Sequence, residues 1–258
     1  MSTVQSLDRA IELLRLISAN YREGERLSDL VKASGLAQPT VHRLLKQLVE
    51  GGLVMQDADR RYRLGHFAYE LGLAAASHFG LRQQCAPYLE RISQETGDTA
   101  FLVVRSGNDS FCLDRQSGSF PIQVLTVEVG KRRPLGIGGG GLALLSFMPE
   151  AELPAVLTRI APHLKPYGGL TRGILQKLVA QARQRGYAAI TDYAVAGVTS
   201  VGVPIRDRTG QVLGAVSVSA IASRMAEREA MVVRIMQREV AALQAALQGA
   251  ASGRTAST

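Results

Sequence analysis

A run of polar and basic side chains between Gln38 and Gly51 has the chemistry needed to contact DNA. Its sequence is QPTVHRLLKQLVEG, and its apolar residues recur at helical spacing: Val41, Leu44, Leu45, Leu48 and Val49. The opposite face carries two positive charges and several amide and hydroxyl groups, from Gln38, Thr40, His42, Arg43 and Lys46. Such groups suit phosphate oxygens and base edges in a major groove. For each of them alone, a solvated helix face is the competing interpretation.

Reactive chemistry elsewhere in the chain has weaker support. The candidates for a nucleophile or an acid and base are scattered and form neither GxSxG nor HExxH: Ser200, Ser217, Asp192 and His163. The four glycines 138–141 do not form a Walker A loop, because Leu142 stands where a lysine should follow. We therefore expect no enzyme, although one built on the C-terminal half stays open as an alternative.

The two cysteines, Cys85 and Cys112, define a further alternative. They form no CxxC motif and have no histidine at ligand spacing, which argues against a disulfide framework or a zinc site. The alternative is a DNA-binding regulator switched by thiol chemistry at Cys85 and Cys112. Two unrelated buried thiols are the favoured interpretation, so we expect no metal and no cofactor.

Elements around the polar run must position it. Apolar residues at helical spacing predict a first helix over 4–19, and a second short helix over 27–36 has Ser28 as a candidate cap and Gly35 as its end. After Gly51-Gly52, the stretch LVMQDADRRYRLG predicts two short strands around a turn, with Arg60 and Arg61 at the tip. Three helices and this β-wing predict a winged helix-turn-helix over residues 1–65.

Charge does not locate that domain by itself. The formal net charge of the 258 residues is +8, but residues 1–65 hold ten Lys and Arg against eight Asp and Glu, a net of only +2. DNA contact must then depend on a few placed residues. The chain has no apolar run long enough to span a membrane and no N-terminal leader pattern, so we expect a cytoplasmic protein without membrane association.

Beyond residue 65 the pattern indicates a second domain. An Ala-rich segment over 66–80 predicts a linker helix, followed by a helix over 81–95 that contains Pro87. Period-two patterns predict strands over 99–107, 110–118, 121–130, 199–205 and 212–219. A glycine loop leading into a helix and two later helices complete an α+β fold over 81–249, with one antiparallel sheet flanked by helices. We expect a disordered tail over 250–258.

In order and spacing, several of these stretches resemble the IclR family of bacterial transcription regulators, from about residue 4 to about residue 247. The matching stretches are PTVHRLLKQLVEGG, RRYRLG, LGL and the strand pair GVTSVGVPIRD…GQVLGAVSVS. The resemblance implies an N-terminal winged helix-turn-helix, a linker helix and a GAF-like effector domain. It further implies a ligand-responsive regulator of a catabolic operon. Such a regulator forms a homodimer or tetramer, binds a palindromic operator in double-stranded DNA and responds to a small carboxylic acid.

Carried over by position, the DNA-reading surface of the family falls on Gln38, Thr40, His42, Arg43, Lys46, Arg60 and Arg61. The effector pocket falls on Leu125, Gly139, Gly140, Val198, Ser200, Ser217 and Ser219. Physical arguments support part of this pocket: Ser217 and Ser219 alternate with valines, so their hydroxyls point together. The glycines also allow backbone N–H groups to approach an anion. A solvent-facing strand and a plain flexible turn are the competing interpretations.

Two departures from the family pattern bear on the ligand. The family often has a Gly-Lys-Ala step before the helix, whereas this chain has Gly141-Leu142-Ala143 and so lacks that cation. After Gly186, where many members have an acidic cluster, only Asp192 remains. We therefore expect a less polar pocket, suited to an aromatic or larger acid better than to glyoxylate-like or pyruvate-like ligands.

Overall fold

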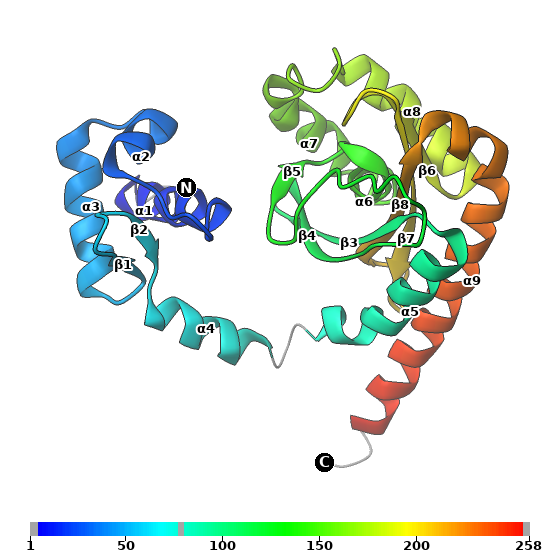
Figure 1. Cartoon of the computed structure of the whole chain (residues 1–258), viewed down its shortest axis with the longest axis horizontal. Coiled ribbons are helices and arrows are strands. Elements are labelled where there is room, and N and C mark those ends of the chain that lie inside the picture. The colour runs from blue at the N-terminus through cyan, green and yellow to red at the C-terminus, as the bar shows by residue number, and fades with distance from the viewer. Residues whose placement is uncertain (1–4, 77–79, 255–258) are drawn as a thin grey trace. The chain divides into compact units, whose positions relative to one another are not determined.

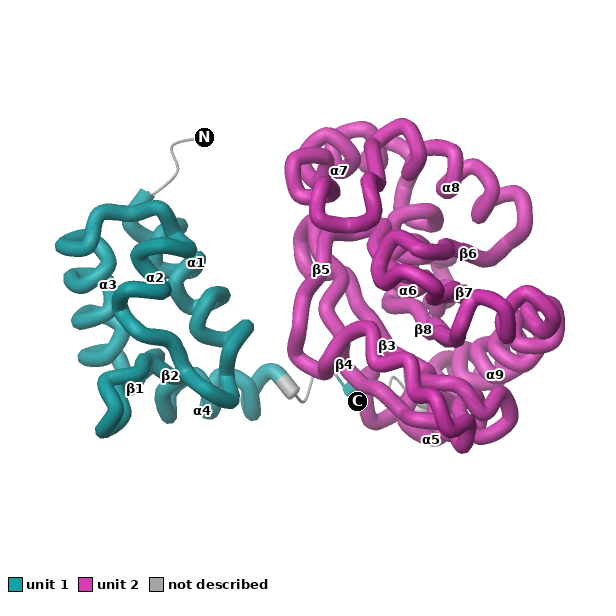
Figure 2. Tube along the Cα trace, turned by 45° about the horizontal axis from the view of Figure 1, so that its top comes forward, with its two compact units in different colours: residues 1–80 teal, residues 81–258 magenta. Residues whose placement is uncertain are grey.

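Two compact units make up the chain in the computed structural model, which describes residues 5–76 and 80–254 (Figure 1). The contact pattern divides them at residue 80, into Met1–Gly80 and Leu81–Thr258 (Figure 2). Each unit has a hydrophobic core of its own. The fold is α+β, with a helix-turn-helix unit followed by an antiparallel sheet and its helices.

Residues 5–76 of the first unit form four helices and a two-stranded sheet. The elements are α1 (Gln5–Ala19), α2 (Leu27–Ser34), α3 (Gln38–Glu50), β1 (Val54–Gln56), β2 (Tyr62–Leu64) and α4 (His66–Ala76). Gly35 ends α2 in the left-handed conformation at φ 66° and donates its N–H to Val31. The expected cap at Ser28 is wrong, because α2 begins one residue earlier and Ser28 lies inside its first turn. The Ser28 hydroxyl instead faces the Asp29 carboxylate.

The core of this unit explains the predicted pattern. It consists of the apolar stripe of α3 together with residues of α1, α2 and the two strands: Leu13, Ile17, Leu30, Val41, Leu45, Leu48, Val54 and Tyr62. Burial of one face of α3 leaves its polar face outward. Strands β1 and β2 pair antiparallel, with Val54 opposite Leu64, and form the predicted wing.

The second unit is built on a six-stranded antiparallel sheet of order β5-β4-β3-β8-β7-β6. Its strands are β3 (Thr99–Ser106), β4 (Asp109–Gln116), β5 (Arg132–Pro134), β6 (Ala188–Thr191), β7 (Val198–Arg206) and β8 (Val212–Ile221). Its helices are α5 (Leu81–Thr96), α6 (Gly138–Ser146), α7 (Leu153–Ile160), the 3-10 turn Ala161–His163, α8 (Arg172–Arg185) and α9 (Ala222–Arg254).

Alternation along the central strands divides the hydrophobic residues of this unit into two clusters. Phe101 and Val103 of β3 belong to the cluster with α6, α7 and α8, whereas Ala100 and Leu102 belong to the cluster with α5 and α9. Successive side chains of a strand point to opposite faces, so the sheet separates the two clusters. The views in Figures 1 and 2 agree in placing α5 and α9 together beside the sheet.

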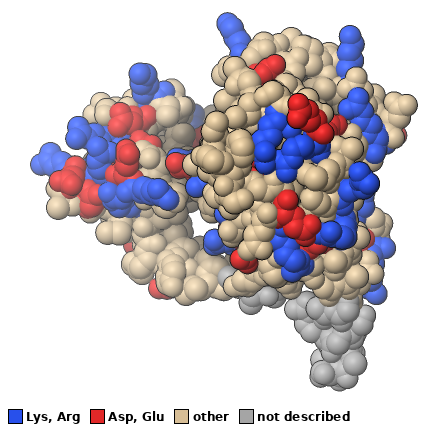
Figure 3. All heavy atoms as spheres, turned by 45° about the vertical axis from the view of Figure 1, so that its right-hand side comes forward, with Lys and Arg blue, Asp and Glu red and all other residues tan. Residues whose placement is uncertain are grey.

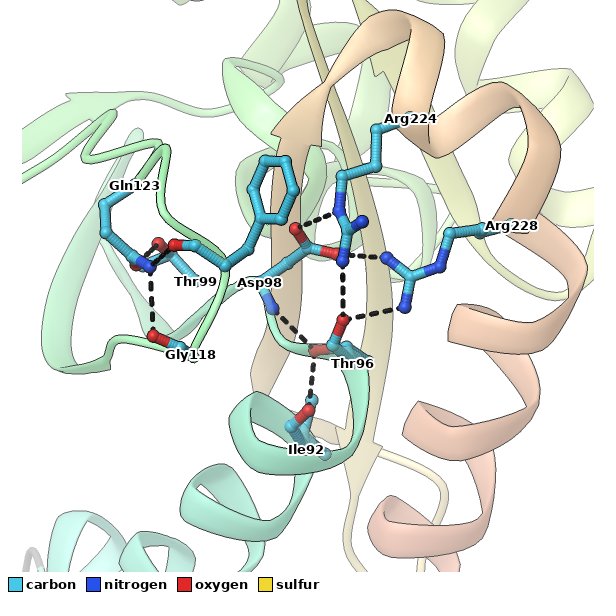
Figure 4. Close-up of polar contacts among 9 residues, drawn as sticks. Ile92, Thr96, Asp98, Thr99, Gly118, Gln123, Arg224 and Arg228 are labelled. Carbon is cyan, nitrogen blue, oxygen red and sulfur yellow. Dashed lines mark hydrogen bonds and ion pairs between the residues drawn. The ribbon is translucent and has the colours of Figure 1, made fainter.

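Charged groups fasten the beginning of α9 to the end of α5. Asp98 is only 4% exposed. Its carboxylate accepts hydrogen bonds from Arg224 Nε at 2.9 Å and from Arg228 Nη1 at 3.0 Å (Figure 4). Arg228 also donates to the carbonyl of Thr96 at 2.8 Å. A buried carboxylate with two guanidinium partners satisfies its hydrogen-bonding capacity, so this contact fixes the relative position of the two helices.

The stretch 121–130 differs from its prediction as a strand. It belongs to a loop, residues 117–131, because β4 pairs at its outer edge with the later strand β5. The apolar alternation has a different origin: Val127 and Val129 pack on the core, while Ile122 and Leu125 are more than half exposed. Gln123 holds the loop at its start, accepting from Thr99 Oγ1 at 3.0 Å and donating to the Gly118 carbonyl at 2.9 Å (Figure 4).

Two further predictions need correction. The four glycines 138–141 form the first turn of α6 and not a loop before it. The expected disordered tail is wrong for residues 250–254, since α9 continues to Arg254, while residues 255–258 lie outside the described part of the chain. None of the described helices combines the length and apolarity that a membrane span requires.

Candidate functional site

Helix α3 presents the predicted DNA-contacting side chains on its outer face. Gln38, His42, Arg43 and Lys46 are exposed and Thr40 is half-buried, whereas Val41, Leu45 and Leu48 face the core. Lys46 lies 3.8 Å from Glu50 in an exposed ion pair one helical turn away. Such a surface pair contributes little, so it leaves the ammonium group able to exchange its partner for a phosphate.

The N-terminus of α3 is open to an anion. Ala37 occupies the capping position and supplies no side-chain hydrogen bond, and a proline stands in the first turn. The first N–H groups of a helix have no intrahelical acceptor, and the helix dipole favours negative charge there. Gln38 and Thr40 lie in this turn, so a phosphate could meet backbone N–H groups and polar side chains together.

Arginines of the wing differ in their environment. Arg60 is exposed at the tip, at φ 57°, and no hydrogen bond or ion pair of its side chain is found among the described residues. Arg61 is half-buried and donates from Nη1 to the carbonyl of Gly24 at 3.1 Å. Arg63 pairs with Asp57 and donates to the carbonyls of Arg22 and Glu23. Arg61 and Arg63 therefore join the wing to the loop after α1.

Charge on this unit is mixed, as its composition indicated. On the face of the Met1–Gly80 unit seen in Figure 3, basic and acidic side chains lie interspersed. DNA contact by such a unit depends on placed residues more than on its net field.

A cavity in the second unit lies among α6, the middle of the sheet and the loop 117–131. Its free volume is about 30 Å³. The residues around it come from β3, β4, the loop, β5, α6, β7 and β8: Phe101, Val103, Ser110, Cys112, Thr126, Val127, Lys131, Arg133, Ile137, Gly138, Gly139, Gly140, Gly141, Ser200, Ser217 and Ser219.

Five of the seven residues predicted for the effector pocket line this cavity: Gly139, Gly140, Ser200, Ser217 and Ser219. Leu125 and Val198 do not line it. Leu125 is 52% exposed on the loop, and Val198 is half-buried at the start of β7. Their role as ligand contacts stays a prediction.

Sequence reasoning missed Lys131 and Arg133, which bring two basic side chains to this cavity although α6 lacks the lysine. The positive charge comes from other elements, since Lys131 ends the loop 117–131 and Arg133 lies on β5, opposite Ser110 of β4. Two basic residues just before the glycine run were the available signal. Their relevance depends on a strand register that the sequence does not display.

Hydroxyl groups connect β8, β7 and α6 at the cavity. Ser219 Oγ donates to Ser200 Oγ at 3.0 Å, and Ser200 Oγ accepts the N–H of Gly139, also at 3.0 Å. These serines are at most 5% exposed. Ser217 faces the same cavity, and no hydrogen bond of its hydroxyl is found among the described residues. The cavity thus offers a free hydroxyl beside the positive end of a helix.

Close packing explains the glycines. A Cβ on Gly139 would lie 2.6 Å from the carbonyl carbon of Val201, and one on Gly140 would lie 2.6 Å from Val103 Cγ2. Gly202 lies opposite Gly139, and a Cβ on Gly202 would lie 2.1 Å from the carbonyl oxygen of Gly139. The first turn of α6 can therefore rest on β7 only where both surfaces lack side chains.

The two cysteines are poorly suited to redox sensing. Each is 1% exposed, and Cys85 and Cys112 belong to different hydrophobic clusters on opposite faces of the sheet. Burial raises the pKa of the Cys85 thiol to about 12 and that of the Cys112 thiol to about 11. Because the thiolate is the reactive form, neither group is activated near neutral pH.

The cavity lacks the groups that would activate its serines. No histidine, aspartate or glutamate is among the described residues that line it. His163 is exposed after α7, and Asp192 accepts the Gly197 N–H at 2.7 Å within a turn. No metal-binding cluster of His, Cys, Asp or Glu occurs in residues 5–76 and 80–254. The arrangement suits binding of a polar ligand.

Each of the two units matches a family model of known proteins. A family model described as the bacterial transcriptional regulator IclR C-terminal domain matches residues 73–246, and the IclR helix-turn-helix model matches residues 6–58. The HTH-type transcriptional regulator XynR of Escherichia coli is 30% identical over 231 residues, which cover 89% of this chain and 91% of XynR.

Two solved structures are similar over nearly the full length. One, described as an IclR transcriptional regulator of a Silicibacter species, is 26% identical, with a TM-score of 0.81 and coverage of 94% of this chain and 96% of that chain. The other is an IclR homologue of Microbacterium hydrocarbonoxydans complexed with 4-hydroxybenzoate. It is 28% identical, with a TM-score of 0.72 and coverage of 95% and 99%.

Proposed function

Because the chain belongs to the IclR family of bacterial transcriptional regulators, we propose that a small organic acid bound in its second unit controls how its first unit binds DNA. The protein is a DNA-binding transcriptional regulator and not an enzyme. In this proposal the protein is cytoplasmic and regulates a catabolic operon. The enzymes that the operon encodes act on the acid or on its precursor. The cavity beside α6 is the observation that carries the proposal.

The DNA-reading surface proposed here consists of the seven side chains predicted from the sequence. Arg43 and Lys46 lie on the exposed face of α3, where they can reach phosphates or a guanine edge. Gln38 and Thr40 flank the open N-terminus of the helix, and His42 lies on the same outer surface. Arg60 reaches outward from the wing, whereas Arg61 would have to contact DNA while keeping its bond to Gly24.

An acid is supported as the ligand by the chemistry of the cavity. The N-terminus of α6, the Ser217 hydroxyl and two basic residues all favour an anion. The related Microbacterium protein was crystallised with 4-hydroxybenzoate, which is a carboxylic acid. These observations support a carboxylate as one group of the effector.

Assembly into a homodimer, or into a tetramer formed by two dimers, belongs to the same proposal. Helix α4 exposes large apolar side chains: Phe67 at 40%, Tyr69 at 68%, Leu71 at 49% and Leu73 at 56%. A short helix with such a surface is normally covered by another protein surface. A second copy of this chain is the occupant we propose, because two symmetric recognition helices would match a palindromic operator.

In this mechanism the effector changes the population of dimer arrangements and so the spacing of the two α3 helices on DNA. A ligand with equal affinity for both arrangements would change nothing. DNase footprinting upstream of the gene and of neighbouring catabolic genes tests the proposal. We expect two protected half-sites about one helical turn apart, and their protection should change when the correct acid is added. Absence of any protected segment would refute DNA-binding regulation at those promoters.

A further inference from the structure

The register of β4 and β5 places two basic side chains at the cavity. Ser110 lies opposite Arg133, and Phe111 lies opposite Arg132. Directly opposed residues of an antiparallel pair share a face of the sheet. Ser110 lines the cavity, so Arg133 is on the cavity face, and Lys131, two residues earlier, has the same orientation. Arg132 lies on the other face, where it covers the Phe111 ring at 5.2 Å.

Arg133 has an incomplete set of partners. Its guanidinium group donates to the carbonyl of Thr126 on the loop 117–131. Within residues 5–76 and 80–254, no carboxylate lies at ion-pair distance from Arg133, although eleven such pairs involve other residues. Arg133 is half-buried, and burial lowers its pKa. A cation withdrawn from water ordinarily has an anionic partner.

Anion-favouring groups therefore occur on two separate sets of elements around the cavity. One set is the first turn of α6 with Ser217, where N–H groups and a hydroxyl are directed at the cavity. The other is Arg133 with Lys131, on β5 and the end of the loop. Apolar residues that line the same cavity include Phe101, Val103 and Cys112. Each of the two sets can accept one carboxylate, the first through N–H groups and a hydroxyl and the second through a guanidinium group.

We propose that Arg133 pairs with a second anionic group of the effector, which makes the ligand a small dicarboxylic acid. This inference rests on the proposed function, since it assigns the charge of the effector in the same cavity. One carboxylate lies at the first turn of α6 and Ser217, and the other replaces Thr126 as the partner of the guanidinium group. Arg133 is then the residue that distinguishes a diacid from a monoacid.

The size of the cavity limits the choice of ligand. Its free volume of about 30 Å³ accommodates only a few atoms, so even a short diacid requires the loop to move outward. The contact between Arg133 and Thr126 is the one that the second carboxylate would replace. Ligand charge and loop position are coupled through this one side chain.

Calorimetric titration with matched acids tests the inference on the full-length protein. The probes are malonate, succinate and glutarate against propanoate, butanoate and pentanoate, with terephthalate against 4-hydroxybenzoate as the aromatic pair. We expect the best diacid to bind about 10- to 100-fold more tightly than its monoacid partner, the range of one charge-assisted contact. Arg133→Met should remove that advantage and leave the affinity for the monoacid within about threefold.

Arg132→Met is the matched control, because it removes the neighbouring charge from the opposite face of β5 and should leave both affinities unchanged. Equal or tighter binding of monoacids, or equal losses for both acids in Arg133→Met, would overturn the inference. Monoacid binding that depends on Ser217 but not on Arg133 would overturn it while leaving the proposed function intact. If no acid binds although the footprint persists, the inference and the proposed acid effector both fail, but DNA binding stands.

Discussion

Arg63 donates a hydrogen bond of 2.8 Å from Nε to Oδ2 of Asp57, across the base of the wing. The other carboxylate oxygen of Asp57 accepts the N–H groups of Asp59 and Arg61 at 3.1 and 2.8 Å. One carboxylate thus organises the turn that carries Arg60. The hydrogen bond from Arg63 is the main reason that the pKa of Asp57 lies below its ordinary value of 3.8.

Acid should therefore loosen the wing before it unfolds the helices. A carboxylate whose pKa is lowered by folding stabilises the folded state above its ordinary pKa, and this contribution is lost as the pH falls below about 3.8. Amide hydrogen exchange at Asp59 and Arg61 should accelerate in that range, and Asp57→Asn should show faster exchange already at neutral pH. Unchanged protection in the variant would show that the turn does not depend on the carboxylate.

Arg43 and Lys46 should contribute to DNA affinity in different ways. Arg43→Ala should cost about 1–3 kcal/mol of binding if the guanidinium reads a base, with the largest loss on the preferred site. Lys46→Ala should weaken binding to all sequences and reduce the slope of affinity against salt by about one. Fluorescence anisotropy at several salt concentrations measures both. Lys32→Ala on α2 is a charge-matched control, and unchanged affinity in both test variants would remove this face from the DNA interface.

Substitution of the two wing arginines, Arg60 and Arg61, should affect the stability of the protein differently. Arg61→Ala removes the hydrogen bond to the Gly24 carbonyl. The melting temperature of the variant should therefore fall, and its free energy of unfolding should decrease by about 1 kcal/mol. Arg60→Ala should leave the melting temperature unchanged and weaken DNA binding, because this exposed side chain is free to contact phosphate. Thermal unfolding and anisotropy of the same samples distinguish the roles. A loss of stability in Arg60→Ala would contradict the assignment.

Removal of both strand hydroxyls should abolish the response to the effector. In Ser217→Ala with Ser219→Ala, the cavity loses its free hydroxyl and the donor to Ser200, while Ser200 keeps the Gly139 N–H. The thermal shift given by an effector acid should disappear, and DNA affinity without ligand should stay the same. Thr209→Ala, in an exposed turn, serves as a control. A shift of undiminished size in the double variant would place the ligand outside this cavity.

The cysteines should respond to pH and not to oxidants. Burial raises both thiol pKa values above the ordinary 9.0, so the unfolded chain loses these protons first and the free energy of unfolding should decrease as the pH rises above about 9. At pH 8 a disulfide reagent such as DTNB should label neither thiol until denaturant is added. Rapid labelling of the native protein would revive a redox role for Cys85 or Cys112.

Local patterns were sufficient for the first unit but not for the cavity. The stripe of α3, the left-handed Gly35 and the wing depend on neighbours within a few residues, and each was predicted. The position of Arg133 depends on its pairing with Ser110, 23 residues earlier in the chain, which no local pattern records. The alternation over 121–130 misled for a related reason. A loop that packs Val127 and Val129 against a core shows the same alternation as a strand over those residues.

The exposure and contacts of single side chains in the structure also changed the roles assigned to them from the sequence. Arg60 and Arg61 are equivalent in the sequence, yet only the structure shows that Arg61 contacts Gly24. Leu125 was assigned to the pocket by position in the family, but the neighbouring Thr126 and Val127 line the cavity in this structure. A family resemblance does not predict, to within one residue, which side chain of a loop lines a cavity.

Contact between Gly139 and Gly202 limits how this regulator could acquire a new ligand. Any side chain at either position would collide with the backbone of the facing element, and a side chain at Gly140 would collide with the side chain of Val103. Mutation can therefore do little at the floor of the cavity without dislodging α6 from the sheet. In the loop 117–131 and in β5, Thr126, Val127 and Arg133 already present side chains to the cavity. If the proposed function holds, a change of effector would therefore arise through these side chains, while the glycines of the cavity floor stay constant.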